Sequence, residues 1–211
     1  MTEQDRHAAL WDCIVGRRSV RRMQERNVSR GDLEALVEAA AWSPSPHKAQ
    51  PWRFALVDER RRLQRLAGEM AAAFRADLER DAVEPATIER LCGESVERFG
   101  SAPAMLVPCL TMEEMRRYPD ARRRRAEEEM AIMSAGAALQ NLMLRAHALG
   151  LATCWYSAPL FCQEVVRRAL DLPAGWQPLA IVIVGYAAVS PPLPPRREFQ
   201  SLLRYAEAAN A

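Results

Sequence analysis

Residues 121–149 read ARRRRAEEEMAIMSAGAALQNLMLRAHAL, and this stretch decides the fold. It predicts one long helix from about Ala121 to Leu149, rich in Ala, Met and Leu, with Gly150 as its C-cap. Beyond Met130 the predicted helix is apolar around most of its circumference. A helix of this kind buries its surface against other elements, so we expect it to lie in the middle of the protein.

Apolar segments on both sides of this helix predict the strands of a sheet. They are WRFALV at 52–57, PAMLVPCL at 103–110, LATCWY at 151–156 and PLAIVIVGY at 178–186. Pro108 predicts that the second of these strands lies at an edge or ends irregularly, because proline cannot donate a hydrogen bond to a neighbouring strand.

Amphipathic spacing predicts further helices before and between these strands. Ser29, with Asp32 three residues later, forms a helix start that resembles a capping box. The expected helices span approximately residues 5–16, 29–42, 60–80, 85–99 and 163–170. With no internal repeat and no obvious linker, this order predicts one α+β domain over residues 1–211, in which a sheet packs on helices.

The composition is that of an ordinary globular protein. Of the 211 residues 49% are apolar, and 29 basic residues nearly balance 27 acidic ones. No segment approaches about 18 uninterrupted apolar residues, and the N-terminal MTEQDRHAAL has no basic region followed by an apolar run. We therefore expect a cytoplasmic protein that binds neither a membrane nor nucleic acid.

Several common cofactor and catalytic motifs do not occur in the sequence. The five cysteines form no CxxC, the three histidines form no HExxH, and neither GxG nor GxSxG is present. No metal site, disulfide framework or glycine-rich phosphate loop is therefore expected, and the thiols should be reduced. Because Lys48 is the only lysine among the 29 basic residues, arginines would have to hold any phosphorylated ligand.

Two polar segments are candidate binding sites. The basic run RRSVRR at 17–22 follows a helix directly, so its guanidiniums can bind a phosphate and its serine a polar ligand edge; a solvated turn is the alternative. The loop PSPHKAQPW at 44–52 is stiffened by prolines, which suits a preorganised binding loop, although turn and capping roles are equally open. The polar side chains of this loop are Ser45, His47, Lys48 and Gln50.

Two further segments allow either a binding or a structural role. The strand GLATCWYS at 150–157 can present backbone groups to a flat ring, or it can be a buried strand with core aromatics. Arg122–Arg125 followed by Glu127–Glu129 form three pairs at i,i+4, which suit a solvated helix face. Four cations at a helix N-terminus oppose its dipole, however, and an acidic ligand would relieve that cost.

In combination these segments resemble the nitroreductase family of flavoproteins. The similarity is carried by RRSVR at 17–21, by Pro44-Ser45 and Gln50-Pro51-Trp52 in the loop, and by Gln140-Asn141 in the helix that leads to Gly150-Leu151. The motifs follow the family's order over nearly the whole chain.

A closer resemblance is to one branch, the C-terminal FMN domain of the bifunctional coenzyme F420:L-glutamate ligase, which is its dehydro-F420 reductase part. It rests on PSPH at 44–47, YPDAR at 118–122 and Cys154-Trp155. The N-terminal ligase domain of that branch has no counterpart here, so we expect no glutamate addition. Lys48 stands where the branch tends to have a second histidine.

The resemblance implies FMN as the cofactor and assigns residues to it by position. The phosphate and ribityl chain would be held by Arg17, Arg18, Ser19, Val20 and Arg21, with Arg196 or Arg197 completing the phosphate site. Residues expected to line the flavin are Ser45, Lys48 and Ser157. Residues expected to approach the substrate are His47, Asp77 and Met130.

The resemblance also implies a fold and an assembly. We expect a three-layer α/β/α sandwich with a mainly antiparallel sheet, in a domain-swapped homodimer with two FMN sites at the subunit interface. The proline-rich SPPLPPRR at 190–197 predicts a C-terminal segment that runs extended over a surface. The resemblance implies that this segment, residues 187–211, lies over the partner subunit.

The activity implied is that of an FMN-dependent oxidoreductase that passes a hydride from reduced flavin to a small-molecule substrate. A deazaflavin of the dehydro-F420 type is the first expected substrate, which would connect the chain to coenzyme F420. A general NAD(P)H-dependent reductase of nitroaromatics or quinones is the first alternative. A flavin or deazaflavin binding protein without catalytic activity is the second.

Overall fold

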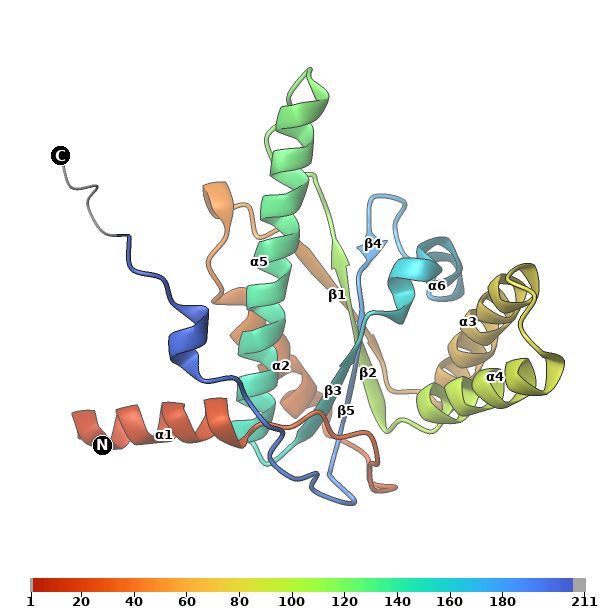
Figure 1. Cartoon of the computed structure of the whole chain (residues 1–211), viewed down its shortest axis with the longest axis horizontal. Coiled ribbons are helices and arrows are strands. Elements are labelled where there is room, and N and C mark those ends of the chain that lie inside the picture. The colour runs from red at the N-terminus through yellow and green to blue at the C-terminus, as the bar shows by residue number, and fades with distance from the viewer. Residues whose placement is uncertain (1, 207–211) are drawn as a thin grey trace.

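A sheet of five strands lies at the centre of the computed structural model, which describes residues 2–206 (Figure 1). All pairings between its strands are antiparallel. The strand order is β1 (Trp52–Val57), β2 (Ala104–Leu110), β5 (Ile181–Gly185) and β3 (Ala152–Tyr156), and the short β4 (Gln177–Pro178) also pairs with β2. The four predicted strands are confirmed, with the last one divided into β4 and β5.

Pro108 lies in a central strand, so the prediction of an edge strand was wrong. On one side Pro108 is paired with Phe54 of β1. On the other side the partner of β2 changes from β5 to β4, and the register shifts by one residue between Leu106↔Val182 and Cys109↔Pro178. The missing N–H of proline therefore faces this bulge-like break, while its carbonyl still accepts a hydrogen bond from the Leu179 N–H at 2.9 Å.

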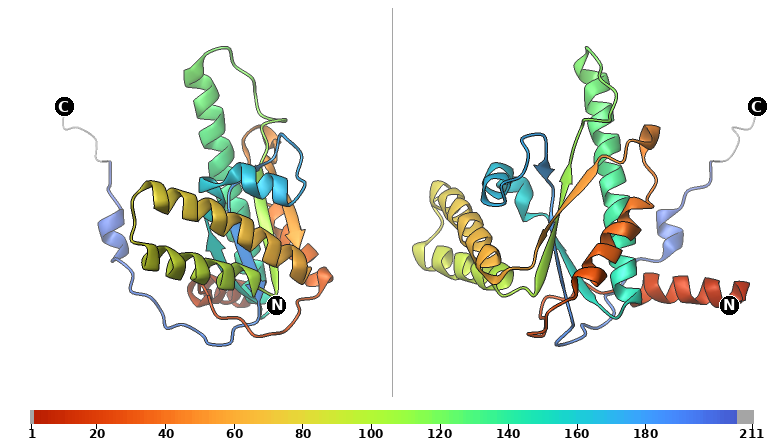
Figure 2. Two further views of the ribbon diagram at one scale, coloured as in Figure 1. Left: turned by 90° about the vertical axis from the view of Figure 1, so that its right-hand side faces the viewer. Right: turned by 180° about the vertical axis from the view of Figure 1, so that it is seen from behind.

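Helices cover both faces of the sheet and complete the three layers, as Figure 2 shows from two sides. On one face α2 (Arg30–Ala41) and α5 (Ala121–Ala148) pack against side chains that include Leu106 and Val182. On the other face α3 (Arg60–Arg80) and α6 (Gln163–Ala169) pack against Met105 and Ile183, and α4 (Pro85–Gly100) packs against α3. Because neighbouring strand residues point to opposite faces, the apolar strands supply both cores. This confirms the expected α+β sandwich and the burial of α5.

Local hydrogen bonds set the helix ends where the sequence predicted them. The Asp32 N–H donates to the Ser29 Oγ at 3.0 Å and begins α2. At the C-terminal end of α5, Gly150 adopts a φ of 73°, a conformation that glycine tolerates at little cost. The N–H groups of Gly150 and Leu151 then bond the carbonyls of His147 and Ala146, which is a Schellman motif.

The first helix and the C-terminal segment lie outside this core. Helix α1 (Glu3–Gly16) begins at a Thr2 capping box but buries none of its residues, and it projects from the rest of the chain (Figure 1). Residues 187–206 run past the same side and contain only the short 3-10 helix η3 (Phe199–Leu202). The last five residues of the segment predicted to cover a partner, 207–211, lie outside the described residues. None of the helices in residues 2–206 is long and apolar enough to cross a membrane.

Candidate functional site

The arginine-rich segment lies along β3, which is an edge strand of the sheet. Ser19 forms an isolated parallel bridge with Thr153, and the Val20 N–H donates to the Thr153 carbonyl at 2.9 Å. The Val20 side chain is buried, which fixes the segment in place, whereas Ser19 and Arg21 on either side of it are exposed. The sheet edge therefore presents residues 17–21 as an extended row of polar side chains.

Arg17 carries an unsatisfied donor within this row. Its Nε is buried and has no hydrogen-bond partner in the part of the chain that the structure describes. Burial lowers the pKa of Arg17, and the positive charges of Arg196 and Arg18 lower it further. Three cations close to a buried, unpaired N–H form a site that an anion such as a phosphate would stabilise. FMN, which carries one phosphate, therefore fits these residues.

Of the two arginines predicted from the C-terminal segment, Arg196 is the one whose positive charge lowers the pKa of Arg17. Arg197 is exposed and has no ion pair or hydrogen bond among residues 2–206. A small pocket of about 200 Å³ opens between the Arg17 end of the row, Thr153 and Pro191. The C-terminal segment thus contributes to the arginine site of its own chain.

Arg18 is already engaged by the backbone of its own segment. Its guanidinium donates to the carbonyls of Val15, Gly16 and Arg17, which are unpaired at the end of α1. Arg18 therefore ends the helix and shapes the turn into residues 17–21, and its charge adds to the anion site.

The end of β3 carries a second unsatisfied group, the Tyr156 hydroxyl. Its Oη is buried without a hydrogen-bond partner in residues 2–206. Burial raises the pKa of Tyr156 to about 12, the Cys154 thiol adds to this, and the charges of Arg98 and Arg21 oppose it. The sequence prediction included Tyr156 only as a residue of the strand; nothing local in the sequence distinguishes it from a core aromatic.

Ser157 and Asp77, predicted at the flavin and the substrate respectively, line one pocket of about 690 Å³. The Ser157 Oγ accepts a hydrogen bond from the Trp155 Nε1 at 3.1 Å. Asp77 forms an ion pair with Arg80 at 3.0 Å on α3. The fold therefore brings together two predicted residues that are 80 positions apart in the chain.

The proline-rich loop before β1 has an unusual backbone. His47, Lys48 and Gln50 have φ angles of 57°, 59° and 46°, in the left-handed region that costs roughly 1–2 kcal/mol for residues other than glycine. The Gln50 N–H donates to the Ser45 Oγ at 3.0 Å, which closes the loop. Lys48 is exposed and has no ion pair among residues 2–206. Such strain persists only where other contacts hold the loop.

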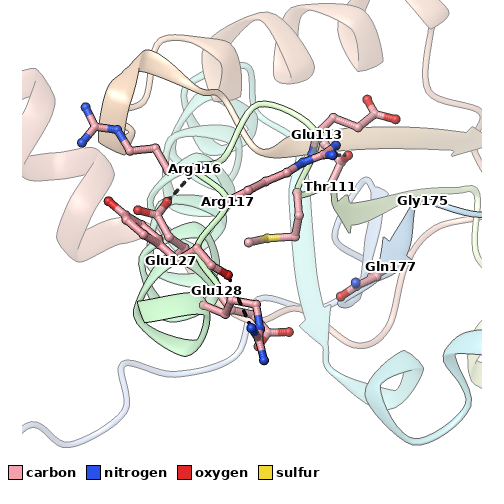
Figure 3. A pocket seen from close by; sticks show the side chains of 11 residues that line it. Thr111, Glu113, Arg116, Arg117, Glu127, Glu128, Gly175 and Gln177 are labelled. Atoms are coloured by element: carbon pink, nitrogen blue, oxygen red, sulfur yellow. Dashed lines mark hydrogen bonds between the residues drawn. The ribbon is translucent and has the colours of Figure 1, made fainter. Parts of the chain in front are cut away.

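Glu127 supplies one of these contacts. Its side chain is buried, its Oε1 lies 3.3 Å from the His47 Nε2, and its Oε2 accepts the Arg116 N–H at 3.2 Å. Figure 3 shows this carboxylate directed at the Arg116 backbone. The predicted role of Glu127 in a solvated helix face was therefore wrong. Helical spacing from the buried Ala131 and Ser134 indicates the same face and could have found it.

The arginines of the Arg122–Glu129 run have different ion-pair partners. Of the three predicted i,i+4 pairs, Arg125–Glu129 forms, at 2.8 Å. Arg123 instead pairs with Asp120, whose carboxylate accepts the Arg123 N–H and caps α5. This N-cap places a negative charge beside the four cations, which reduces the dipole cost expected from the sequence.

A second large pocket, of about 670 Å³, lies at the start of α5. Its positive side chains are Arg116, Arg117 and Arg124, and its negative ones are Glu113, Glu127 and Glu128 (Figure 3). Only Arg124 of the predicted Arg122–Arg125 run lines it. Met130, predicted near the substrate, is partly buried and packs against a neighbouring apolar cluster that includes Ala49, Leu110 and Met115.

The predicted site residues therefore form two groups at opposite edges of the sheet. The arginine row, with Ser157 and Asp77 nearby, lies beside β3, whereas Ser45, His47 and Lys48 precede β1. Three strand spacings separate β1 from β3, or about 14 Å across the sheet. One copy of the chain does not bring the two groups together.

These features define a three-layer α+β protein with a cluster of arginines along one edge of its sheet. The model of the Nitroreductase family matches residues 14–186, and the chain belongs to this family. The resemblance at the level of the family is thus confirmed.

Individual relatives agree with this assignment. The Bacillus subtilis (strain 168) protein "Putative NAD(P)H nitroreductase YfhC" is 26% identical over 191 residues, which are 90% of this chain and 91% of that protein. The 5,6-dimethylbenzimidazole synthase of Rhodospirillum rubrum is 27% identical over 195 residues, covering 84% of this chain and 82% of the synthase.

Solved structures share the fold at lower sequence identity. The BluB-like flavoprotein from Clostridium difficile 630 has a TM-score of 0.78 at 20% identity, covering 94% of this chain and 99% of that one. The FMN-dependent nitroreductase NfnB from Mycobacterium smegmatis, solved with NADPH, has a TM-score of 0.73 at 23% identity, covering 96% of this chain and 100% of that one. None of these four proteins is named for deazaflavin chemistry, so the narrower resemblance to the F420 branch gains no support from them.

Proposed function

We propose that this nitroreductase-family protein is an FMN-dependent oxidoreductase that uses NAD(P)H to reduce nitroaromatic or quinone compounds. The observation that carries the proposal is the buried, unpaired Arg17 Nε among the charges of Arg18 and Arg196. The names of the relatives, an NAD(P)H nitroreductase and an FMN-dependent nitroreductase solved with NADPH among them, support this chemistry over the deazaflavin alternative.

The chain's own residues would hold FMN by its phosphate. Arg17 would donate its unpaired N–H to the phosphate, Arg196 would add a second cation, and Ser19 and Arg21 would bind further along the row. The anion would also remove the repulsion among the guanidiniums, because each cation gains an opposite charge. When bound, FMN supplies the hydride transfer between the nicotinamide and the acceptor.

We propose that two copies of the chain form the complete site. A second copy would supply the loop with Ser45, His47 and Lys48, which lies at the opposite edge of the sheet in the first copy. Unpartnered apolar surface supports this assembly: Trp11 on α1 is 57% exposed and Met133 on α5 is 67% exposed. The apolar residues of the C-terminal segment, including Phe199, are exposed as well and fit a segment that covers a partner.

A deazaflavin acceptor is the second candidate. Arg116, Arg117 and Arg124 line the pocket at the start of α5 and offer cations for an acidic deazaflavin tail. Three glutamates line the same pocket and oppose an anion there, which is why the nitro or quinone reductase is preferred. These glutamates and arginines all lie within residues 113–128, and Figure 3 shows Glu127 and Glu128 on α5 across from Arg116 and Arg117.

The test begins with the purified protein and added FMN. We expect a flavin absorbance spectrum, saturable FMN binding, and oxidation of NADPH or NADH when a nitroaromatic or quinone is present. Failure to bind FMN would overturn the proposal. FMN binding without NAD(P)H oxidation would indicate a flavin-binding protein, and turnover that requires a deazaflavin would favour the second candidate. Light scattering coupled to size exclusion tests the dimer, and a monomer that turns over would contradict the shared site.

A further inference from the structure

The pocket that contains Ser157 and Asp77 lies between the α3–α4 hairpin and the segment that follows β3. We call it the hairpin pocket. Its volume of about 690 Å³ falls within the roughly 300–1,000 Å³ typical of small-molecule sites. Its walls are largely aromatic and aliphatic: they include Met70, Phe74, Leu78, Phe99, Tyr156 and Phe161. Walls of this kind suit a flat, apolar ring.

Most charges around the hairpin pocket are already paired. Asp77 pairs with Arg80 at 3.0 Å, and Glu94 pairs with Arg90 at 2.9 Å. Asp81 follows the last residue of α3, at the end of the hairpin remote from the sheet. These groups leave little net charge near the mouth of the pocket beside β3.

Arg98 is the exception. Within residues 2–206 its guanidinium has no ion pair and no hydrogen bond, and it lies 5.6 Å from the centre of the Tyr156 ring. Arg98 is in the last turn of α4, so it is at the same end of the pocket as Ser157. A free cation over an aromatic wall binds a planar anion well, because the guanidinium can pair with its charge while the ring stacks on the wall.

We propose that the hairpin pocket receives the electron acceptor and that Arg98 selects planar aromatic acceptors that carry an anionic group. The inference rests on the proposed function, because it takes Ser157 to lie beside the bound flavin. The ring of the acceptor contacts the aromatic walls, and its carboxylate or similar group pairs with Arg98. Arg98 is therefore a specificity-determining residue, and the chemistry at the flavin does not depend on it.

Two nitroaromatic acceptors that differ only in charge test the inference. 4-Nitrobenzoate and 4-nitrobenzamide share the ring and the nitro group, and only the first is an anion. Because Arg98 is exposed, solvent screens its attraction to the carboxylate of the acceptor, and we expect the natural protein to prefer nitrobenzoate by about 1.5- to 5-fold in kcat/KM. The preference should appear in KM and should weaken as salt is raised.

Variants with opposite effects make the test specific. Arg98→Gln should remove the preference, whereas Asp77→Asn, which frees the charge of Arg80, should increase it. Arg62→Gln is the matched control, because it removes the same charge from α3 at a residue that does not line the pocket and is 61% exposed. A preference that is the same in the natural protein and in all three variants would overturn the inference.

The proposed function is tested in the same samples without any acceptor. FMN affinity and the bleaching of the flavin by NADPH should be the same in the natural protein and in Arg98→Gln. If the flavin binds and is reduced but the preference does not depend on Arg98, only the acceptor assignment fails. If no flavin binds, the proposed function fails and the inference fails with it.

Discussion

Glu127 is the strongest test of how the proline-rich loop and the segment around Arg116 are held in place. Replacing it with alanine removes the carboxylate that contacts the His47 Nε2 at 3.3 Å and the Arg116 N–H at 3.2 Å. A hydrogen bond to a charged group contributes about 1.5–3 kcal/mol, and water can replace part of each bond because His47 and Arg116 are exposed. We therefore expect the free energy of unfolding to fall by about 2–3 kcal/mol.

The assay is thermal and urea unfolding of Glu127→Ala beside Glu128→Ala. Glu128 is adjacent, lines the same pocket, and is exposed without an ion pair among residues 2–206, so it controls for the loss of a charge on α5. For a chain of this size, 2–3 kcal/mol corresponds to a fall in Tm of roughly 4–12 °C. The control should change the free energy of unfolding by no more than about 0.5 kcal/mol.

A double-mutant cycle with His47→Ala separates the loop contact from the rest of the effect. The two substitutions should couple by at least about 0.5 kcal/mol, since the side chains share a contact. Equal stability of the two glutamate variants would refute the inference that the buried Glu127 carboxylate holds His47 and the Arg116 backbone in place. Strict additivity with His47→Ala would show that the loop is held by other contacts.

Three other expectations follow from single residues. Arg196→Gln should weaken FMN binding about ten-fold or more in a fluorescence titration, because it removes a cation from the Arg17 site, and Arg197→Gln should change the affinity less than about two-fold. Gly150→Ala should cost about 1 kcal/mol in urea unfolding, since alanine is strained at the φ of 73°; an unchanged midpoint would contradict the Schellman cap. Burial raises the pKa of the Cys109 thiol from an ordinary value near 9 to about 12. Between these pH values the folded protein keeps the thiol proton while the unfolded chain loses it, so the free energy of unfolding falls as the pH rises. At pH 10 the Cys109 thiol lowers the free energy of unfolding by about 1.4 kcal/mol. In Cys109→Ala the loss of stability from pH 7 to pH 10 should therefore be smaller than in the natural protein by that amount.

The elements of the fold could be predicted because their signals are local. The Ser29 cap, the Gly150 cap and the continuous apolar segments of the strands act over a few positions, and the structure confirms them. Pro108 depends on contacts that are remote in the sequence. The residue does avoid donating to a neighbour, as predicted, but the gap it needs is made by the break between β4 and β5, which lies some 70 residues away in the chain.

The candidate site was predictable in composition and not in arrangement. The sequence indicated that arginines would hold a phosphate, and the row at 17–21 lies beside β3 with a donor left unpaired. Nothing in the sequence distinguishes Arg18, which bonds the end of its own helix, from Arg17, or Arg196 from Arg197. These differences depend on which neighbours the folded chain places around each guanidinium.

The sequence by itself determined the helices, the strands, the family and the reliance on arginine where no glycine-rich loop is present. Only the tertiary structure decided that Glu127 is buried, that Asp77 and Ser157 share a pocket, and that the arginine row and the proline-rich loop lie at opposite edges of the sheet. The physical reason is the separation along the chain of the residues that interact. Backbone caps and periodic apolar patterns act between close neighbours in the chain, whereas burial and the pairing of charges depend on the packing of segments that are remote from one another in the sequence.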